Sequence, residues 1–198
     1  LPGDIIVSVD GENYNGDSLT EASNKIKGQE GENVQLQIKR NEEILDFSII
    51  RENIKLNHVE SKILENNIGY LEISSFDEGC ADEFEEKYKE LEKQGIDSLI
   101  IDLRDNPGGI VSEAIDIAEM LVDKGKTLLI TVDKNNNEEI TKSKQNKIVN
   151  VPIVVLVNAN SASASEILSG ALKDNNAATI VGTKTYGKGV MQEVLKLS

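Results

Sequence analysis

The sequence predicts an α/β protein in which a β-rich segment precedes alternating strands and helices. Three observations support this prediction. Apolar residues alternate with polar ones through much of the first fifty residues, short apolar runs alternate with amphipathic helical stripes beyond about residue 57, and turn-forming residues separate these runs. Alternating strands and helices favour parallel βαβ units, with functional residues on loops at the carboxyl ends of the strands.

The first part of the chain, residues 1–56, is expected to hold one helix among several strands. On that helix Leu19, Ala22 and Ile26 share one face, and Gly28 would end it. A polar turn between two alternating runs predicts a β-hairpin. The expected elements, in order, are a strand at 4–9, the helix at 18–27, the hairpin strands around 34–38 and 44–50, and a linker at 51–57.

The second part, residues 57–198, is expected to alternate strands with helices. Its expected strands are residues 68–73, 98–103, 127–132, 153–157 and 178–181, and those at 127–132 and 153–157 are expected to be buried. Its expected helices are residues 81–93, 114–121 and 162–173. The polar stretch 133–147 is predicted to be an exposed loop.

Composition excludes several classes of protein. The net charge of −14, from 21 basic and 35 acidic residues, argues against a surface that follows nucleic-acid phosphates. No apolar run approaches the roughly 20 residues of a membrane-spanning helix. No His, Asp or Glu cluster has the spacing of metal ligands. Residues 1–4 carry no signal-peptide pattern, and they resemble the middle of a longer protein.

Two turns could carry chemistry. Residues 101–109 end an apolar strand in a turn with two consecutive glycines, whose backbone N–H groups could face a substrate. Residues 158–166 follow a strand and open a helix, where backbone amides stabilise negative charge. Each also has a purely structural interpretation, because the first can be a tight turn and Ser163 with Glu166 fits a capping box. Taken singly, each motif favours the structural interpretation.

Residues 182–189 nearly match a phosphate-binding loop. That motif requires Ser or Thr after the lysine, followed by a helix. Here Gly189 follows Lys188, and residues 190–195 are predicted to be extended. The nucleotide-binding interpretation therefore fails on both counts, and alone Lys188 would be a solvated charge.

The choice of a base is limited by the scarcity of histidine. His58 is the only histidine, and it lies next to the expected linker. The single cysteine, Cys80, is flanked by acidic residues that would disfavour its thiolate. If the protein is a hydrolase that uses serine, lysine is the natural base. A lysine base must be neutral, so burial or a nearby positive charge must lower its reference pKa of about 10.4.

Together, the motifs resemble those of the carboxyl-terminal processing (tail-specific) serine peptidases. Residues 102–109, 161–167 and 182–192 occur in the order and approximate spacing of that family, and Ser163 and Lys188 (188 − 163 = 25 positions apart) fit its Ser-Lys dyad. The resemblance implies the following roles: Ser163 as nucleophile, Lys188 as general base, Gln192 as the residue that orients the lysine, the N–H groups of Gly109 and Ala164 as oxyanion hole, and Asp174 as a structural acid.

The resemblance also implies an architecture. Residues 1–11 resemble the middle of a PDZ domain, so we expect a partial PDZ domain at 1–56. A crotonase-like (ClpP/crotonase-type) peptidase core is expected at 57–198, with further strands after Ser198. The partial PDZ domain and the strands expected after Ser198 would leave unpaired strand edges in this chain, which would favour self-association into homo-oligomers.

The implied function is a serine endopeptidase that cleaves proteins near their C-termini through an acyl-enzyme. Its partners would be proteins or peptides with an unstructured C-terminus, with no metal or organic cofactor and no nucleic acid. Family analogy places it in the bacterial cell envelope, periplasmic or extracellular. The alternative is an inactive PDZ-type fragment that only binds peptides, which the presence of Ser163, Lys188 and Gln192 argues against.

Overall fold

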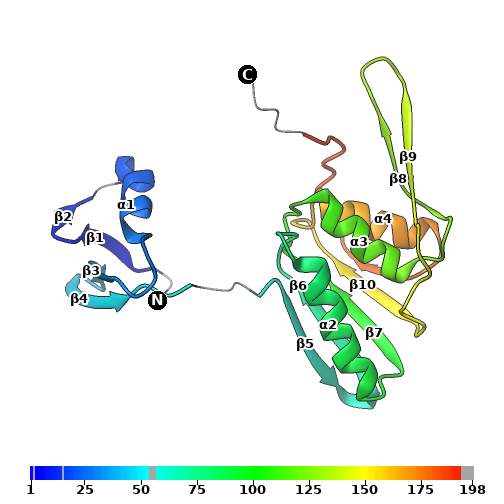
Figure 1. Cartoon of the computed structure of the whole chain (residues 1–198), viewed down its shortest axis with the longest axis horizontal. Helices are drawn as coiled ribbons and strands as arrows, with labels where there is room; N and C mark the ends of the chain where they lie inside the picture. The colour runs from blue at the N-terminus through cyan, green and yellow to red at the C-terminus, as the bar shows by residue number, and fades with distance from the viewer. Residues whose placement is uncertain (2, 15, 54–56, 193–198) are drawn as a thin grey trace. The chain divides into compact units, whose positions relative to one another are not determined.

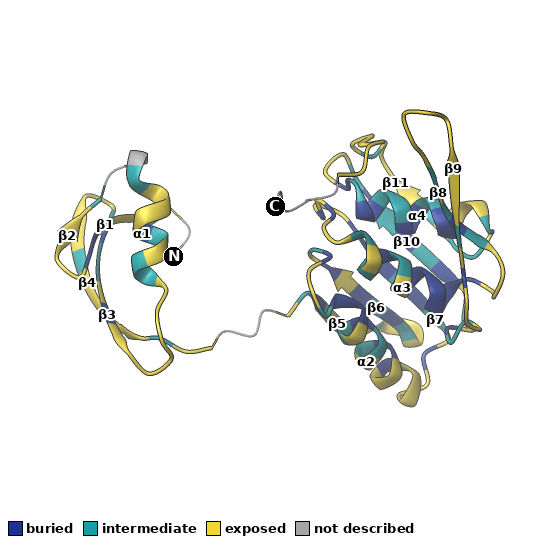
Figure 2. Cartoon of the chain, turned by 45° about the horizontal axis from the view of Figure 1, so that its top comes forward, coloured by how far each residue is buried: buried dark blue, intermediate teal, exposed yellow. Residues whose placement is uncertain are grey.

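The chain forms two compact units, Leu1–Leu56 and Asn57–Ser198 (Figure 1). The computed structural model describes residues 1, 3–14, 16–53 and 57–192. Buried residues are concentrated in the second unit, while most of the first unit is exposed (Figure 2).

The first unit is a four-stranded antiparallel sheet with one α-helix. The strands follow the order β2-β1-β3-β4. They are β1 (Ile5–Val9), β2 (Glu12–Asn13), β3 (Asn33–Arg40) and β4 (Glu43–Ile50), and helix α1 is Leu19–Ile26. The predicted hairpin is confirmed, with Arg40 paired to Glu43 across its turn. The helix also forms as predicted, but Leu19 is 76% exposed and only Ala22 of this helix is buried.

The second unit is built on a five-stranded sheet with the order β11-β10-β7-β6-β5. Its strands are β5 (Val59–Leu64), β6 (Ile68–Ile73), β7 (Ser98–Asp102), β10 (Ile153–Val157) and β11 (Thr179–Gly182), and its helices are α2 (Cys80–Lys93), α3 (Val111–Leu121) and α4 (Ala164–Asp174). Strands β6, β7, β10 and β11 are parallel to one another, as predicted. Strand β5 was not predicted; it pairs antiparallel to β6 at the edge of the sheet, where polar side chains weaken its pattern.

Burial alternates along the central strands. On β6, Leu71 and Ile73 are buried while Glu72 between them is exposed. Strand β10 buries every second residue in the same way. The predicted stripe of α2, namely Phe84, Tyr88 and Leu91, is buried in the same core. This packing fixes the carboxyl ends of β7 and β10, which lead into the two turns singled out above.

A second, two-stranded sheet corrects two predictions. Strand β8 (Thr127–Val132) pairs antiparallel with β9 (Glu138–Lys142), a strand inside the stretch predicted to be loop. The prediction of a buried strand at 127–132 is wrong except at Leu128, because β8 pairs with β9 and not with the central sheet. Ile130 faces Ile140 across this hairpin, and both are exposed.

Among the helices in the described ranges, none is long and apolar enough to cross a membrane.

Candidate active site

Ser163 lies in the turn between β10 and α4, and its backbone is unusual. Its φ of 56° and ψ of −113° fall outside the conformations that non-glycine residues commonly adopt. The predicted capping box is present, and the Ser163 N–H donates to Oε2 of Glu166 at 2.9 Å. The side chain is half-buried at the start of the helix. Such strain is typical of functional sites that a surrounding structure holds in place.

The glycine turn packs directly against this serine. A Cβ on Gly108 (φ +99°) would lie 2.6 Å from the carbonyl oxygen of Ala162 and 2.8 Å from Cβ of Ser163. A Cβ on Gly109 (φ +146°) would lie 2.3 Å from the carbonyl oxygen of Phe76. Both positions therefore require glycine, for close approach as well as for backbone conformation.

Two backbone N–H groups beside Ser163 have no acceptor among the residues that the structure describes. The N–H of Gly108 donates to Oδ1 of Asn106 at 2.8 Å. Within the described part of the chain, by contrast, no hydrogen bond engages the N–H of Gly109 or of Ala164. Gly109 is exposed, so its N–H can donate to an oxygen outside the protein, whereas Ala164 is fully buried in this structure.

The segment that carries Lys188 is fastened to the serine turn. The N–H of Tyr186 donates to the carbonyl oxygen of Ser161 at 3.0 Å. Thr185, Gly187 and Lys188 all donate to the carboxylate of Glu166. Burial raises the pKa of this carboxyl, but hydrogen bonds from Thr185, Gly187, Ser163 and Lys188 hold it below its ordinary value. The sequence indicated only the capping role of Glu166, because its other partners lie 19 to 22 residues away.

Ser163 and Lys188 line the same two cavities, of about 590 and 510 Å³. Residues that border both are Leu129, Ile130, Ser163, Ile167 and Lys188. The larger cavity extends along α4 past Gly170 to Asp174, and the smaller extends toward Val132 and Met191. Gln192, the last described residue, is exposed and borders neither cavity. The contribution of β8 to these walls was not predicted, since its sequence suggested a core strand.

The other candidate side chains lie away from these cavities. Nδ1 of His58 is 3.2 Å from Oγ of Ser75 and 3.6 Å from Oδ2 of Asp77. Cys80 is fully buried, and burial together with the nearby Glu113 carboxylate raises the pKa of its thiol to about 12. Neither residue borders a cavity with Ser163.

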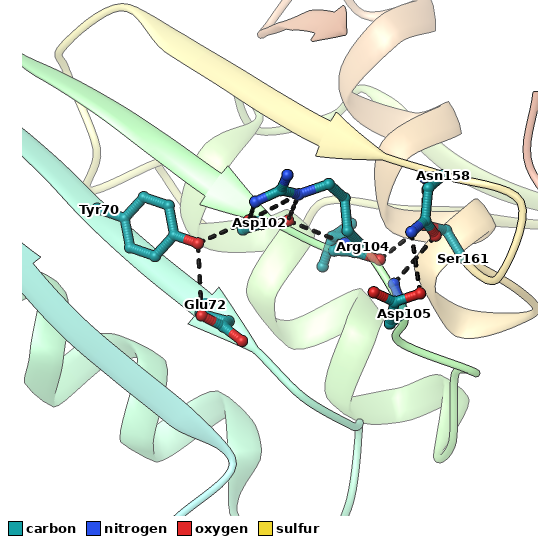
Figure 3. Close-up of polar contacts among 8 residues, drawn as sticks. Tyr70, Glu72, Asp102, Arg104, Asp105, Asn158 and Ser161 are labelled. Carbon is teal, nitrogen blue, oxygen red and sulfur yellow. Dashed lines mark hydrogen bonds and ion pairs between the residues drawn. The ribbon is translucent and has the colours of Figure 1, made fainter. Parts of the chain in front are cut away.

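A polar network supports the glycine turn (Figure 3). The buried carboxylate of Asp102 accepts hydrogen bonds from the Tyr70 hydroxyl at 2.6 Å and from Nε of Arg104 at 2.9 and 3.0 Å. Burial, and then the bond to Asp102, raises the pKa of Tyr70 to about 12. Asp105 and Asn158 exchange two hydrogen bonds of 3.0 Å, which join the glycine turn to the serine turn.

Buried hydroxyl groups join the same two turns more deeply. Oγ of Ser161 donates to the carbonyl oxygen of Leu103 at 2.6 Å, and Oγ of Ser165 donates to that of Asn106 at 3.0 Å. The Asn106 amide in turn donates to the carbonyl oxygen of Ile73 at 2.8 Å. The serine turn, the glycine turn and the end of β6 thus form one hydrogen-bonded body.

Across the residues that the structure describes, no group of three or more His, Cys, Asp or Glu side chains could hold a metal ion.

Comparison with known proteins decides the family. The family model "Peptidase family S41" matches residues 67–198. The chain belongs to peptidase family S41. A model for a PDZ domain matches residues 1–40. Family S41 contains serine-type peptidases, in agreement with the resemblance described above.

Individual S41 relatives are similar over almost the whole chain. The chain is 38% identical to the carboxy-terminal processing protease CtpA of Bacillus subtilis (strain 168), covering 96% of this chain and 41% of the relative. It is 36% identical to the carboxyl-terminal-processing protease of Picosynechococcus sp., covering 98% of this chain and 48% of the relative. The chain therefore spans less than half the length of these two relatives.

Among solved structures, the chain is similar to the photosystem II D1 C-terminal processing protease. The TM-score is 0.64 at 32% identity, with 98% of this chain and 55% of that structure covered. That solved protease is thus similar to this chain in sequence and in fold over nearly all of the chain's length.

Proposed function

We propose that this chain carries the active site of a serine endopeptidase that cleaves proteins near their C-termini through a Ser-Lys dyad. The observation that supports this most is that Ser163 and Lys188 border the same two cavities, next to two N–H groups that have no partner in the described part of the chain. Residues 57–198 would be a crotonase-like peptidase core, and residues 1–56 part of a PDZ domain.

The chemistry would proceed in two steps. The neutral amine of Lys188 takes the proton of the Ser163 hydroxyl as Oγ attacks the peptide carbonyl. The N–H groups of Gly109 and Ala164 then donate to the oxyanion of the tetrahedral intermediate. Lys188 passes the proton to the departing amine, leaving an acyl-enzyme. Water, deprotonated by Lys188, hydrolyses that ester and regenerates the serine.

Gln192 would orient the lysine amine without adding charge. It borders neither cavity in this structure, so this role requires residues 189–192 to move toward the lysine. Lys188 is itself exposed. A bound substrate that covers it would favour the neutral form that a base needs.

The substrate would be an extended polypeptide with an unstructured C-terminus. The two cavities share Ser163 and extend in different directions from it, so chain can continue on both sides of the scissile bond. Leu129, Ile130 and Ile167 give the shared wall an apolar character that fits apolar substrate side chains. By analogy with the family, the protein would act in the bacterial cell envelope or outside the cell.

The test is cleavage of a protein with an unstructured, apolar C-terminal tail, by the 198-residue chain and by the longest native form of the protein. Ser163→Ala and Lys188→Ala should each lower cleavage by several orders of magnitude, and His58→Ala should leave it nearly unchanged. Equal losses from Lys188→Ala and His58→Ala would contradict the dyad. Tail binding without cleavage by either unsubstituted form would favour the alternative of an inactive peptide-binding module.

A further inference from the structure

Both oxygens of the Glu166 carboxylate accept two hydrogen bonds each. Oε1 accepts from Oγ1 of Thr185 at 2.8 Å and from the N–H of Gly187 at 2.7 Å. Oε2 accepts from the N–H of Ser163 and from the N–H of Lys188, both at 2.9 Å. We call this carboxylate and its four donors the Glu166 cluster.

The bonds to Oε2 restrict the distance between the two proposed catalytic residues. Because the backbone nitrogens of Ser163 and Lys188 are each 2.9 Å from one atom, they can be no more than twice that distance, 5.8 Å, apart. Lys188 itself is exposed, and residues 183–192 around it form no strand or helix. Charge-assisted bonds to a carboxylate are stronger than those between neutral groups.

We infer that Glu166 is a positioning residue, whose carboxylate fixes the backbone of Lys188 beside that of Ser163. The inference rests on the proposed function, because it assigns meaning to the distance between the proposed base and nucleophile. The sequence of α4 alone suggests only a helix cap. A cap satisfies the amides of its own helix, whereas three of the four donors here belong to residues 185–188.

Glu113 provides a matched control. It is a half-buried glutamate in the first turn of α3, and it accepts hydrogen bonds from the N–H groups of Gly79 and Ala81, at 3.3 and 2.8 Å. It therefore fastens a neighbouring segment to a helix start, as Glu166 does, without contacting Ser163 or Lys188. Glu113→Gln therefore measures how far the loss of such hydrogen bonds affects folding, separately from any effect on Ser163 and Lys188.

The first arm of the test is amide hydrogen exchange in the 198-residue chain, which requires no activity. Glu166→Gln leaves one acceptor oxygen and turns an NH2 group toward the remaining donors. The amides of Gly187 and Lys188 should then exchange roughly tenfold faster. Glu113→Gln should accelerate exchange at Gly79 and Ala81 only. Unchanged protection of Lys188 in Glu166→Gln would overturn the inference.

The second arm is kinetic and uses whichever form of the protein cleaves the test substrate. Glu166→Gln should lower kcat by about ten- to a hundredfold with KM changed less than about twofold, because misplacing a catalytic group affects chemistry more than binding. Glu113→Gln should keep kcat within about twofold. Thr185→Val should lower kcat to an intermediate value, and Thr185→Ser, which keeps the hydroxyl, should restore it.

The two arms separate failure of this inference from failure of the proposed function. If Ser163→Ala still cleaves, the proposed function is wrong, and hydrogen exchange alone decides whether Glu166 holds the Lys188 segment. If Ser163→Ala is inactive while Glu166→Gln and Thr185→Val both keep kcat within about twofold, the dyad stands and the positioning role is wrong. If Glu166→Gln does not fold, the Thr185 pair decides the question.

Discussion

At the residue scale, Ser163 combines a favourable helix-capping position with a strained backbone. It begins a helix, and it has a positive φ of 56° that is costly for any residue with a Cβ. The strain is maintained by the packing of Gly108 and by the bond to Glu166. Under the proposed function, this strained serine at the border of two cavities would meet a substrate without any rearrangement of its backbone.

The strain can be measured with two variants that both lack the hydroxyl. Ser163→Gly should be more stable than Ser163→Ala by about 1 kcal/mol, because glycine adopts positive φ without steric cost. The control is Ser169, inside α4, where alanine should be the more stable replacement by a similar amount. Denaturant unfolding of the four variants tests this. An alanine variant at 163 as stable as the glycine variant would show that the conformation is not strained.

The acid response of Glu166 follows from its lowered pKa. Near neutral pH the carboxylate is charged in the folded and unfolded states, so its contribution to stability is fully present. That contribution should be lost as pH falls through the unfolded value of about 4.3 and then through the lower folded value. Urea unfolding at several pH values should show Glu166→Gln less stable than wild type near neutrality, with the gap closing in acid. A constant gap would contradict this.

At the element scale, helix α4 forms one wall of the larger cavity through a glycine. A Cβ on Gly170 would meet no atom within 4 Å beyond its own helix and neighbours, and Gly170 borders the cavity together with Ile167 and Ala171. Glycine at this position costs the helix about 1 kcal/mol relative to alanine, and it keeps the cavity wide.

Replacing Gly170 with a larger residue should therefore stabilise the helix, and a large side chain there should narrow the range of substrates. Gly170→Ala should raise the free energy of unfolding by up to about 1 kcal/mol. Gly170→Leu should lower cleavage after large apolar residues more than cleavage after small ones, because its side chain would occupy the cavity. Product mapping by mass spectrometry on one substrate with both kinds of site gives the ratio. An unchanged ratio would show that this cavity does not receive a side chain next to the scissile bond.

The network at the ends of β6 and β7 has an alkaline signature. Burial and the bond to Asp102 raise the pKa of Tyr70 to about 12. Its contribution is fully present below the unfolded tyrosine value of about 10 and is lost as pH rises toward 12. Absorbance titration should show one phenol fewer ionising near pH 12 in Tyr70→Phe. If Tyr70→Phe instead removes a phenol that ionises near pH 10, the result would contradict the hydrogen bond between Tyr70 and Asp102.

At the scale of the whole molecule, the two units differ in the size of their cores. The core cluster of the second unit runs from Val59 to Leu172 and includes residues from all three of its helices. Among the described residues of the first unit, the buried apolar ones are Val9, Ala22, Val34 and Ile38. A unit of about 56 residues is marginal even with a full core.

Expressed separately, the units should therefore behave differently. Residues 57–198 should unfold in one cooperative thermal transition, and residues 1–56 should show no cooperative transition at low concentration. Circular dichroism melts test both expectations, with the 198-residue chain as reference. A cooperative melt of residues 1–56 would show that its few buried apolar side chains suffice for this unit to fold on its own.

The sequence predicted the parallel strands and their helices because their apolar periods are strong, as on Ile153–Val157. It did not predict β9, whose pairing with β8 depends on contacts between residues that are polar or exposed. At the site, the resemblance brought together Ser163 and Lys188, which border shared cavities. The role of Gln192 stays a prediction. The second function of Glu166 depends on tertiary contacts with residues 185–188, which no local pattern reveals.

The contact between Gly108 and Ser163 also indicates where this protein can be redesigned. A side chain at Gly108 would meet backbone and the serine itself, and no repacking of neighbouring side chains could make room for it. The turns are therefore poor targets for directed evolution. The cavity walls at Leu129, Ile167 and Gly170 are formed by residues on regular elements, so under the proposed function libraries there should change which peptide is accepted while the turns around Ser163 stay intact.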